Sequence, residues 1–535
     1  MTTHHKVDKI DLKAIAWDAM KKYGFEPEFP KSVIQEVDAI NAEIPPDIHG
    51  DVRDLRTLLW SSIDNFDSMD LDQIEYCERG QNGEIKIKVA IADVDLYVPK
   101  HSQADLYAAY NGTSVYTDIE TFTMLPDKLS KGITSLLPGQ DCRAIVIEYT
   151  VLPDGSIRHG DVYQALVSNK AKLIYEEVGE WLEETRAIPE TVREVPDLEE
   201  QLHLQNEATF RMRKYRMKHG ALDLETIEVS TIIEEGSVRD LVIQRQNMAR
   251  CLIEEFMIAA NGTMVAYLGK AGIPMIQRVV LTPKYWDDIV MKAATYGEKL
   301  PSKPNSKALS KFLTRQKEAD PECFPDLSLT IIKLMGPGKY MALEPGEPPL
   351  GHFGLAVTDY THSTAPNRRY VDLIIQRLLR SVIDREKSPY TLEELIELSA
   401  WLSDREKGSK KVERFMRKAA AAVLLQDRIG ESFDAFVTGA SEKGTYVRLI
   451  TPPAEGRVMQ GEHGLTVGQK VRVRLINTNP YKGYIDFICI TKGKERPWQR
   501  MRSSQTTDRK GDRKGGNSGF AKKYTPKKRK SKRRR

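Results

Sequence analysis

Residues 85–91 alternate strictly between large apolar side chains and lysine or alanine, which limits this part of the chain to a strand with one buried face. Ile85, Ile87, Val89 and Ile91 occupy the alternate positions. Successive side chains of a strand point to opposite faces, so apolar residues two apart share one face. An Asn-Gly pair just before the run predicts a hairpin turn.

The segments after this strand predict a mixed architecture. The alternation shifts by one residue at 92–93 and resumes over 94–98, so we expect a β-bulge there. Strand patterns recur at 144–151 and 160–167, with a Pro-Asp-Gly turn between them. Helical spacing of apolar residues dominates from 175 to 267.

Four regions follow from these patterns and indicate an α+β fold class. At 535 residues the chain is longer than one core usually supports. The regions are an N-terminal helical region at 1–58, a mixed-sheet unit at 59–425, an OB-like barrel of five short strands at 430–492, and a disordered basic tail at 493–535.

Charge is divided unevenly between the tail and the rest of the chain. Residues 492–535 contain 19 Lys and Arg against three acids, whereas the whole chain has a formal net charge of +4. The remainder is therefore acidic. An acidic body with a basic arm points to nucleic acid, although a tail that only increases solubility is the alternative.

Several function classes are disfavoured by the sequence. No apolar run reaches the roughly 20 residues of a membrane span, and the first residues lack a secretory signal pattern. The five cysteines are scattered without a CxxC pair, which argues against a zinc clamp or a disulfide framework. We expect a cytoplasmic protein with no membrane contact; a nuclear or organellar address stays open.

Four carboxylates lie within nine residues, at Asp64, Asp67, Asp70 and Asp72. Such charges repel one another unless a cation joins them. Oxygen ligands favour Mg²⁺ or Mn²⁺ over zinc, and two-metal sites use clusters of this kind to cleave phosphodiesters. An acidic surface loop is the alternative.

Two adjacent arginines, Arg368 and Arg369, follow Pro366 and precede an apolar helical run. Proline favours the first position of a helix, so we expect both arginines in the first helical turn. The helix dipole disfavours cations there unless an anion binds, which predicts a phosphate site. Exposed arginines paired with neighbouring acids are the alternative.

Three further residues are candidates for substrate contacts. Glu254 lies on a segment, 248–261, that is apolar around nearly its whole circumference, so its carboxylate needs a partner. That partner is a site arginine, a ribose hydroxyl or, in a purely structural role, Arg250. Tyr116 and Tyr175 lie among polar residues, where aromatic rings stack on bases or simply fill the core.

These segments, in this order, resemble the ribonuclease II / ribonuclease R family, whose RNB catalytic domain folds around an RNA channel. The resemblance covers about 60–385, and the strands at 430–491 resemble the S1-type OB-fold barrel that follows this domain. The chain looks like a short form without the N-terminal cold-shock domains, and its similarity to the shorter members makes a winged-helix-like form one option for the helical region at 1–58. The matching segments are Ile63–Gln73, Val89–Val94, Thr113–Tyr116, Met124–Pro126, Leu252–Asn261, Gly351–Leu355 and Ala365–Tyr370.

For the metal site, the resemblance assigns Mg²⁺, or Mn²⁺, to Asp64, Asp70 and Asp72, and makes Asp72 catalytic. The family has a fourth aspartate where this chain has Gln73. Glutamine is a neutral and weaker ligand, so metal affinity or rate is expected to differ. Asp67 is one candidate for the missing charge.

For the substrate, the resemblance places Arg368 on the scissile phosphate with Arg369 beside it, and Glu254 next to the terminal nucleotide. Tyr116 and Tyr175 match aromatic positions along the RNA path. Leu224 stands where the family often has a second aromatic residue, so the end-product length is expected to differ.

The resulting expectation is a monomeric, Mg²⁺-dependent 3′→5′ exoribonuclease that hydrolyses single-stranded RNA to nucleoside 5′-monophosphates. A catalytically weak or inactive RNA-binding protein with the same fold is the alternative, and Gln73 is the reason to consider it. In a second alternative, the basic tail docks the chain on ribosomes or an RNA-degradation complex.

Overall fold

The computed structural model combines a curved mixed sheet, surrounding helices and a closed β-barrel. The described residues are 10–41, 43, 52–234, 237–348, 350–441 and 444–492. The predicted basic tail at 493–535 lies outside them.

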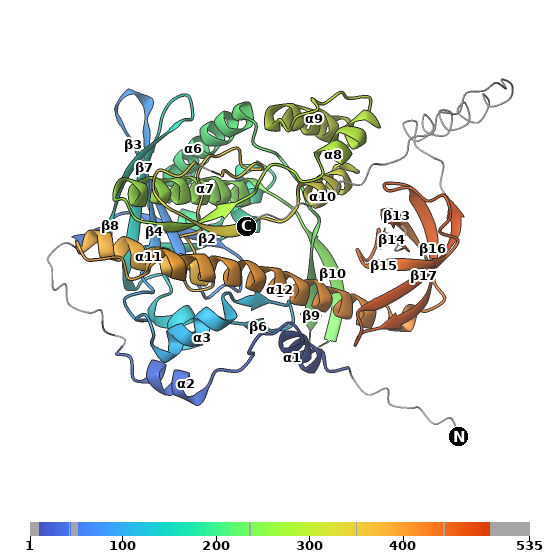
Figure 1. Cartoon of the computed structure of the whole chain (residues 1–535), viewed down its shortest axis with the longest axis horizontal. Helices are drawn as coiled ribbons and strands as arrows, with labels where there is room; N and C mark the ends of the chain where they lie inside the picture. Colours follow the sequence, from blue (N-terminus) through green and yellow to red (C-terminus); the bar gives the residue numbers. More distant parts are fainter. Residues whose placement is uncertain are drawn as a thin grey trace, which may run out of the picture. The chain divides into compact units, whose positions relative to one another are not determined.

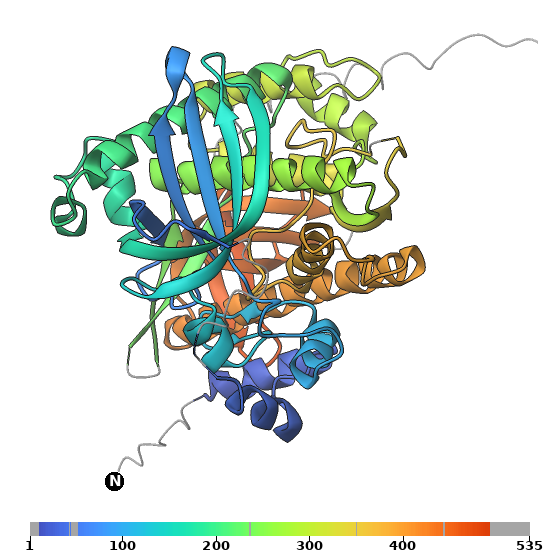
Figure 2. The same ribbon diagram turned by 90° about the vertical axis from the view of Figure 1, so that its left-hand side faces the viewer.

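A curved six-stranded sheet forms the centre of the fold, in the order β1-β8-β2-β3-β4-β7. The long strand β8 pairs with β7 over residues 157–168, with β1 at 165–166 and with β2 over 169–174, so the sheet curls round on itself. Figure 2 shows the sheet with α7, in green, crossing one face. Its strands are β1 (Arg53–Asp54), β2 (Trp60–Asp64), β3 (Gln73–Arg79), β4 (Ile85–Ala92), β7 (Asp141–Val151) and β8 (Ile157–Ile174).

The alternation at 85–91 is confirmed as β4, whose four large apolar side chains are buried. The Asn82-Gly83 turn joins β3 to β4, with both residues in the left-handed region that such turns need. The predicted continuation of the strand is wrong. β4 ends at Ala92, and residues 94–98 form a turn closed by the Val98 N–H donating to the Val94 carbonyl at 3.1 Å.

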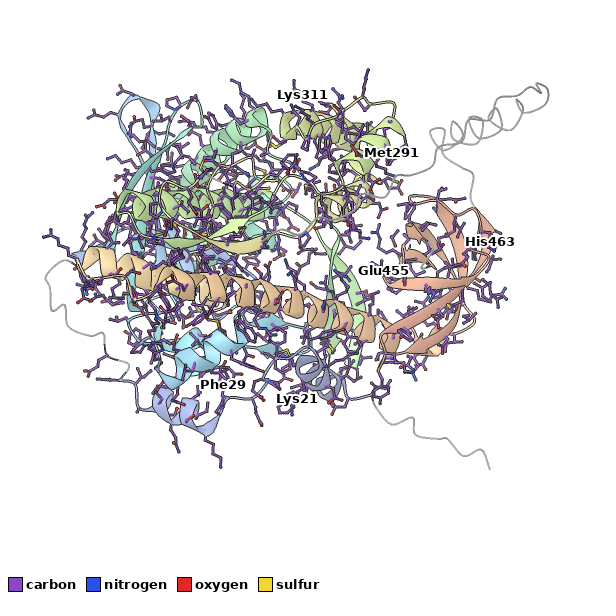
Figure 3. The ribbon with its side chains drawn as sticks, in the orientation of Figure 1. Lys21, Phe29, Met291, Lys311, Glu455 and His463 are labelled. Atoms are coloured by element: carbon purple, nitrogen blue, oxygen red, sulfur yellow. The ribbon has the colours of Figure 1, made fainter. Side chains whose placement is uncertain are left out.

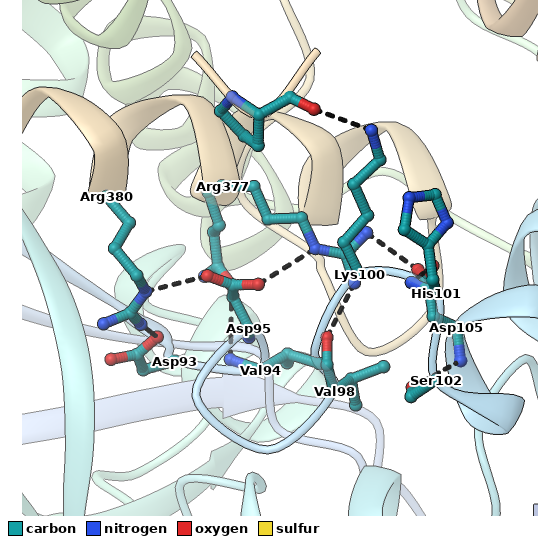
Figure 4. A network of polar contacts seen from close by, with 12 residues as sticks. Asp93, Val94, Asp95, Val98, Lys100, His101, Ser102, Asp105, Arg377 and Arg380 are labelled. Atoms are coloured by element: carbon teal, nitrogen blue, oxygen red, sulfur yellow. Dashed lines mark hydrogen bonds and ion pairs between the residues drawn. The ribbon is translucent and has the colours of Figure 1, made fainter. Parts of the chain in front are cut away.

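An ion-pair network explains why the strand stops there (Figure 4). Asp93 pairs with Arg380 at 2.6 Å, and Asp95 pairs with both Arg377 at 2.9 Å and Arg380 at 2.7 Å. Arg377 also contacts Asp105 at 2.7 Å. Buried charges are tolerated only when they are paired. The network therefore clamps α11 (Tyr370–Ile383) to the segment after β4 and anchors the loop that precedes α11.

Helices surround the sheet, and α7 is the most buried of the long ones. Among the described residues, α7 is the helix whose length and composition would suffice to cross a membrane, but most of it is buried inside the fold, against α6, β7 and β8. The helices besides α11 are α1 (Leu12–Lys22), α2 (Lys31–Asp38), α3 (Gln103–Asn111), α4 (Tyr175–Leu182), α5 (Glu190–Arg193), α6 (Leu198–His219), α7 (Met248–Lys270), α8 (Trp286–Ala294), α9 (Ser306–Ala319), α10 (Phe324–Met335) and α12 (Leu392–Leu424).

Three two-stranded ribbons complete this unit. They are β5 (Val115–Tyr116) with β6 (Thr121–Phe122), β9 (Glu228–Glu234) with β10 (Ser237–Gln244), and β11 (Met275–Val279) with β12 (Lys339–Leu343). The N-terminal region is helical as expected, with α1 packed on α12 and α2 packed on α3. Its described residues, 10–41, 43 and 52–58, contain the helices α1 and α2, and the winged-helix-like form stays a prediction.

The predicted five-stranded barrel is confirmed as a closed barrel. Its strands are β13 (Ser432–Ser441), β14 (Gly444–Leu449), β15 (Glu455–Gln460), β16 (Lys470–Asn479) and β17 (Tyr484–Lys492). The long helix α12 reaches the barrel and contacts β16 and β17 (Figure 1). Glu455, labelled in Figure 3, pairs with Lys418 of α12 at 3.4 Å.

Candidate active site

The aspartate cluster lies where two neighbouring strands meet a short loop. β2 ends at Asp64 and its antiparallel neighbour β3 begins at Gln73, so the loop between them turns back on itself. This arrangement brings Asp64 and Asp72 to the same edge of the sheet. Asp67 lies at the exposed part of the loop.

Asp72 is the most buried member of the cluster, with 2% of its surface exposed. Its Oδ1 accepts a hydrogen bond from the Asn367 N–H at 3.1 Å, and its Oδ2 accepts one from Arg368 Nε at 3.1 Å. Burial raises the pKa of Asp72 to about 7, against the opposing effect of Arg368 and with a smaller contribution from Asp70. Metal-free Asp72 is thus poised to exchange a proton near neutral pH.

Arg368 approaches the cluster from a loop nearly 300 residues further along the chain, and 43% of its side chain remains exposed. Its carbonyl accepts hydrogen bonds from the Ser114 N–H at 2.9 Å and from Thr113 Oγ1 at 3.0 Å. The backbone of Arg368 is therefore held in place, and its guanidinium makes one hydrogen bond to Asp72. The rest of the guanidinium is exposed, so a phosphate can reach it.

The prediction that both arginines lie in the first turn of a helix is wrong. α11 begins at Tyr370, so Arg368 and Arg369 precede it, and the Arg369 backbone is extended. The two side chains also differ: Arg369 bonds to the fully buried Asp372 at 2.7 Å and is largely buried itself. A single exposed arginine, Arg368, therefore faces the aspartates, and Arg369 stabilises the loop.

The segment that holds the Arg368 backbone also brings Tyr116 to the cluster. The Tyr116 hydroxyl donates a hydrogen bond to Asp70 Oδ2 at 2.9 Å, and the ring remains 39% exposed. Asp64 accepts hydrogen bonds on Oδ1 from the Asn65 N–H at 2.7 Å and from Ser68 Oγ at 2.9 Å. Burial raises the pKa of Asp64 above its usual range.

Tyr175 begins α4 directly after β8, and the Arg250 guanidinium stacks 4.5 Å from its ring centre. Burial raises the pKa of Tyr175, and the charges of Asp64 and Glu75 raise it further. The ring therefore lies close to the carboxylates. Arg250 pairs with Glu176 at 2.8 Å, which overturns the structural pair between Arg250 and Glu254.

A cavity of about 410 Å³ opens beside Tyr175, and its lining includes Leu224, Arg250 and Glu254. Glu254 is expected to need a partner, and its Oε2 accepts a hydrogen bond from Gln246 Nε2 at 3.3 Å while the side chain stays open to the cavity. Its neighbour Glu255 is 1% exposed and accepts a hydrogen bond from Arg216 Nε at 2.8 Å. Helical periodicity could not separate the two, because α7 is apolar on almost every side.

Sequence reasoning missed Glu75, which lies within β3. It is 1% exposed, and neither carboxylate oxygen has a hydrogen-bond partner. Burial raises its pKa well above the usual range, and the charge of Asp64 adds to the effect. The available signal was an acid between Gln73 and Cys77 on the face of β3 that the alternating pattern would bury.

The donors at this site suit a hard divalent cation, since all are carboxylate oxygens and those of Glu75 are buried without partners. These carboxylate oxygens do not form a preformed coordination site. Arg368 and Tyr116 occupy oxygens of Asp72 and Asp70, and no three acid, histidine or cysteine side chains of the described ranges converge closely enough to hold an ion. The chemistry fits a metal, and binding requires these side chains to rearrange.

Comparison with known proteins gives the family. The RNB domain model matches residues 52–385, and the model of the RNase II-type exonuclease C-terminal S1 domain matches 431–488. Ribonuclease R of Thermotoga maritima is 30% identical over 504 residues, which cover 88% of this chain and 69% of that protein. Ribonuclease R of Aquifex aeolicus is 32% identical over 512 residues, covering 90% and 71%. Ribonuclease R of Escherichia coli is 28% identical over 527 residues, covering 91% and 64%.

Solved structures show the same fold. Mycoplasma genitalium RNase R in complex with ribose-methylated single-stranded RNA gives a TM-score of 0.80 at 22% identity, covering 90% of this chain and 78% of that one. The same protein in complex with double-stranded RNA gives 0.79 at 23% identity, covering 90% and 83%. With the RNB model covering most of the mixed-sheet unit and the S1 model covering the barrel, this chain belongs to the RNB family of exoribonucleases.

Proposed function

We propose that this chain is a Mg²⁺-dependent hydrolase that removes nucleotides from the 3′ end of single-stranded RNA and releases nucleoside 5′-monophosphates. One observation carries the proposal: Arg368, half exposed, contacts the buried Asp72 at 3.1 Å beside Asp70 and Asp64. This pairing supports phosphodiester chemistry because a guanidinium neutralises phosphate while carboxylates supply oxygen ligands and bases.

The residues around the cluster have distinct roles in this proposal. Arg368 turns its exposed guanidinium from Asp72 to the scissile phosphate and stabilises the charge that develops there. Tyr116 and Tyr175 supply ring faces to the last bases, since stacking is tolerant of base identity. The terminal nucleotide occupies the cavity beside Tyr175, where Glu254 is open to a ribose hydroxyl.

Asp64, Asp70 and Asp72 would hold the cation, with Mn²⁺ as a substitute for Mg²⁺. When bound, such a cation lowers the pKa of a water nucleophile and stabilises the oxygens of the phosphate. Asp72 must then be ionised, and because burial raises its pKa to about 7, the ionised form of the metal-free protein predominates only above neutral pH. Arg368 must at the same time release its Asp72 oxygen.

The test is a time course on a 5′-labelled RNA of about 30 nucleotides with Mg²⁺ or EDTA, alongside Asp72→Asn; a strand of this length exceeds the few nucleotides that one OB-fold barrel covers. We expect a ladder that shortens from the 3′ end, with 5′-monophosphates released only by the metal-loaded wild type. Binding without shortening, in either Mg²⁺ or Mn²⁺, would favour the inactive RNA-binding protein, for which Gln73 is the specific reason.

We further propose a monomeric, cytoplasmic protein whose basic tail adds electrostatic contacts to RNA or to a ribosome or degradation complex. Support for a reducing compartment comes from the five cysteines, none of which forms a disulfide. Support for the tail is its charge alone.

A further inference from the structure

Glu75 is the most anomalous charged group near the site. Among the described residues, it is the carboxylate whose two oxygens are both buried and both without a hydrogen-bond partner. Its register partner on β2, Ser61, also has a buried Oγ without a partner. Burying an ionised carboxylate without partners is costly, so the ionised form of Glu75 requires a partner that the described residues do not supply.

The position of Glu75 relates it directly to Gln73. Alternate residues of a strand share a face, so the side chains of Gln73 and Glu75 leave β3 on the same side. In the pairing with β4, they lie opposite Ile91 and Val89. Asp64, at the end of the adjacent strand, is close enough for its charge to act on Glu75.

The strand pairing places Glu75 beside the strand that carries Asp64. Its register partner Ser61 lies on β2, and β2 ends at Asp64. The charges of Asp64 and Glu75 also both raise the pKa of Tyr175.

The negative charge that Gln73 lacks is present at Glu75. Gln73 removes a negative charge at the position where the family has its fourth aspartate, and Glu75 places one two residues further along the same face. A strand rises about 3.3 Å per residue, and a glutamate is one methylene longer than an aspartate, so Glu75 reaches back over part of that distance.

We propose that Glu75 supplies the fourth carboxylate of the divalent-cation site in this chain, in place of the aspartate that Gln73 replaces. This inference rests on the metal-dependent function proposed above. The unpaired oxygens of Glu75 are the ones that a cation, or a water bound to it, would satisfy. Gln73 then contributes at most a neutral amide oxygen.

The test is Mn²⁺ binding to the full-length chain without RNA, measured from the electron paramagnetic resonance signal of free Mn²⁺. We expect Glu75→Gln and Glu75→Val each to weaken Mn²⁺ binding by about 10- to 100-fold, the range seen when groups supporting a metal site are removed. The double variant Gln73→Asp with Glu75→Val returns the carboxylate to position 73 and should recover most of the affinity.

Glu78→Gln is the matched control, because Glu78 lies on the same strand but the other face, where it pairs with Lys86 at 3.5 Å. It should bind Mn²⁺ as the wild type does. The melting temperatures of metal-free Glu75→Gln and Glu75→Val should not fall below that of the wild type, since each replaces a buried carboxyl group that has no hydrogen-bond partner. A lower melting temperature with an unchanged Mn²⁺-induced rise would show a structural role and overturn the proposal.

The outcomes separate this inference from the proposed function. If Glu75→Gln and Glu75→Val bind Mn²⁺ like the wild type while RNA is degraded, Glu75 is not a ligand and the proposed function stands. A double variant that stays as weak as Glu75→Val refutes the exchange with position 73. If the wild type binds no Mn²⁺, the inference and the metal-dependent function both fail.

Discussion

Replacing Asp72 with asparagine should make the metal-free protein less sensitive to pH while abolishing RNA degradation. Asp72 has an ordinary pKa of 3.8 that the fold raises to about 7, chiefly through burial. A carboxyl whose pKa is higher in the folded state binds its proton more tightly there, so the free energy of unfolding falls as the pH rises through this interval. The loss begins near pH 4 and is nearly complete at pH 8.

The size of the effect follows from the two pKa values. Each unit of difference corresponds to about 1.4 kcal/mol, so ionised Asp72 costs the metal-free fold about 4 kcal/mol at pH 8. Between pH 5 and pH 8 the same two values give a change of about 2–3 kcal/mol. Asparagine does not titrate, so this part of the pH dependence should disappear.

The assay is urea unfolding in EDTA at pH 5 and pH 8, followed by circular dichroism. The difference in unfolding free energy between wild type and Asp72→Asn should change by about 2–3 kcal/mol between the two pH values, in favour of the variant at pH 8. Asp67→Asn, an exposed change in the same loop, serves as the control and should follow the wild type. If the unfolding free energies of wild type and Asp72→Asn change with pH in the same way, the raised pKa of buried Asp72 is refuted.

Three further outcomes test other parts of the structure. Arg368→Lys should lower kcat by about 10²- to 10³-fold with a smaller effect on KM, because one ammonium replaces an oriented guanidinium; equal losses for binding and turnover would contradict a role in the transition state. Asp95→Asn should destabilise the mixed-sheet unit by about 3–5 kcal/mol in chemical denaturation, since it leaves Arg377 and Arg380 short of a buried partner; a change under about 1 kcal/mol would show that the network is dispensable. Deleting 494–535 should weaken binding to long RNA and flatten its salt dependence in filter-binding titrations, and an unchanged salt slope would remove the tail from the RNA contact.

Local patterns predicted the elements of this fold well where one periodicity dominated. The strand at 85–91, the Asn82-Gly83 turn and the five-stranded barrel all follow from side-chain alternation and turn chemistry, which act over a few residues. The bulge after Ala92 was wrong because the apolar residues at 94–98 imitate a strand. Asp93 and Asp95 instead bind α11, almost 290 residues later, and no local pattern contains that information.

The residues of the active site likewise separate into those that the sequence pattern brings together and those that only folding brings together. The sequence alone determined that Asp64, Asp70 and Asp72 lie together, because they share one short loop, and motif order indicated the family. Only the tertiary structure decided that Arg368 reaches Asp72 while Arg369 turns inward.

The same holds for the acids within the strands and helices. Periodicity places Glu75 and Gln73 on one face of β3 but cannot say whether a partner lies opposite. Likewise, the apolar circumference of α7 cannot say which of Glu254 and Glu255 is buried with Arg216. Spacing along the chain determines which side chains share a face, whereas burial and pairing depend on elements that meet only after the chain has folded.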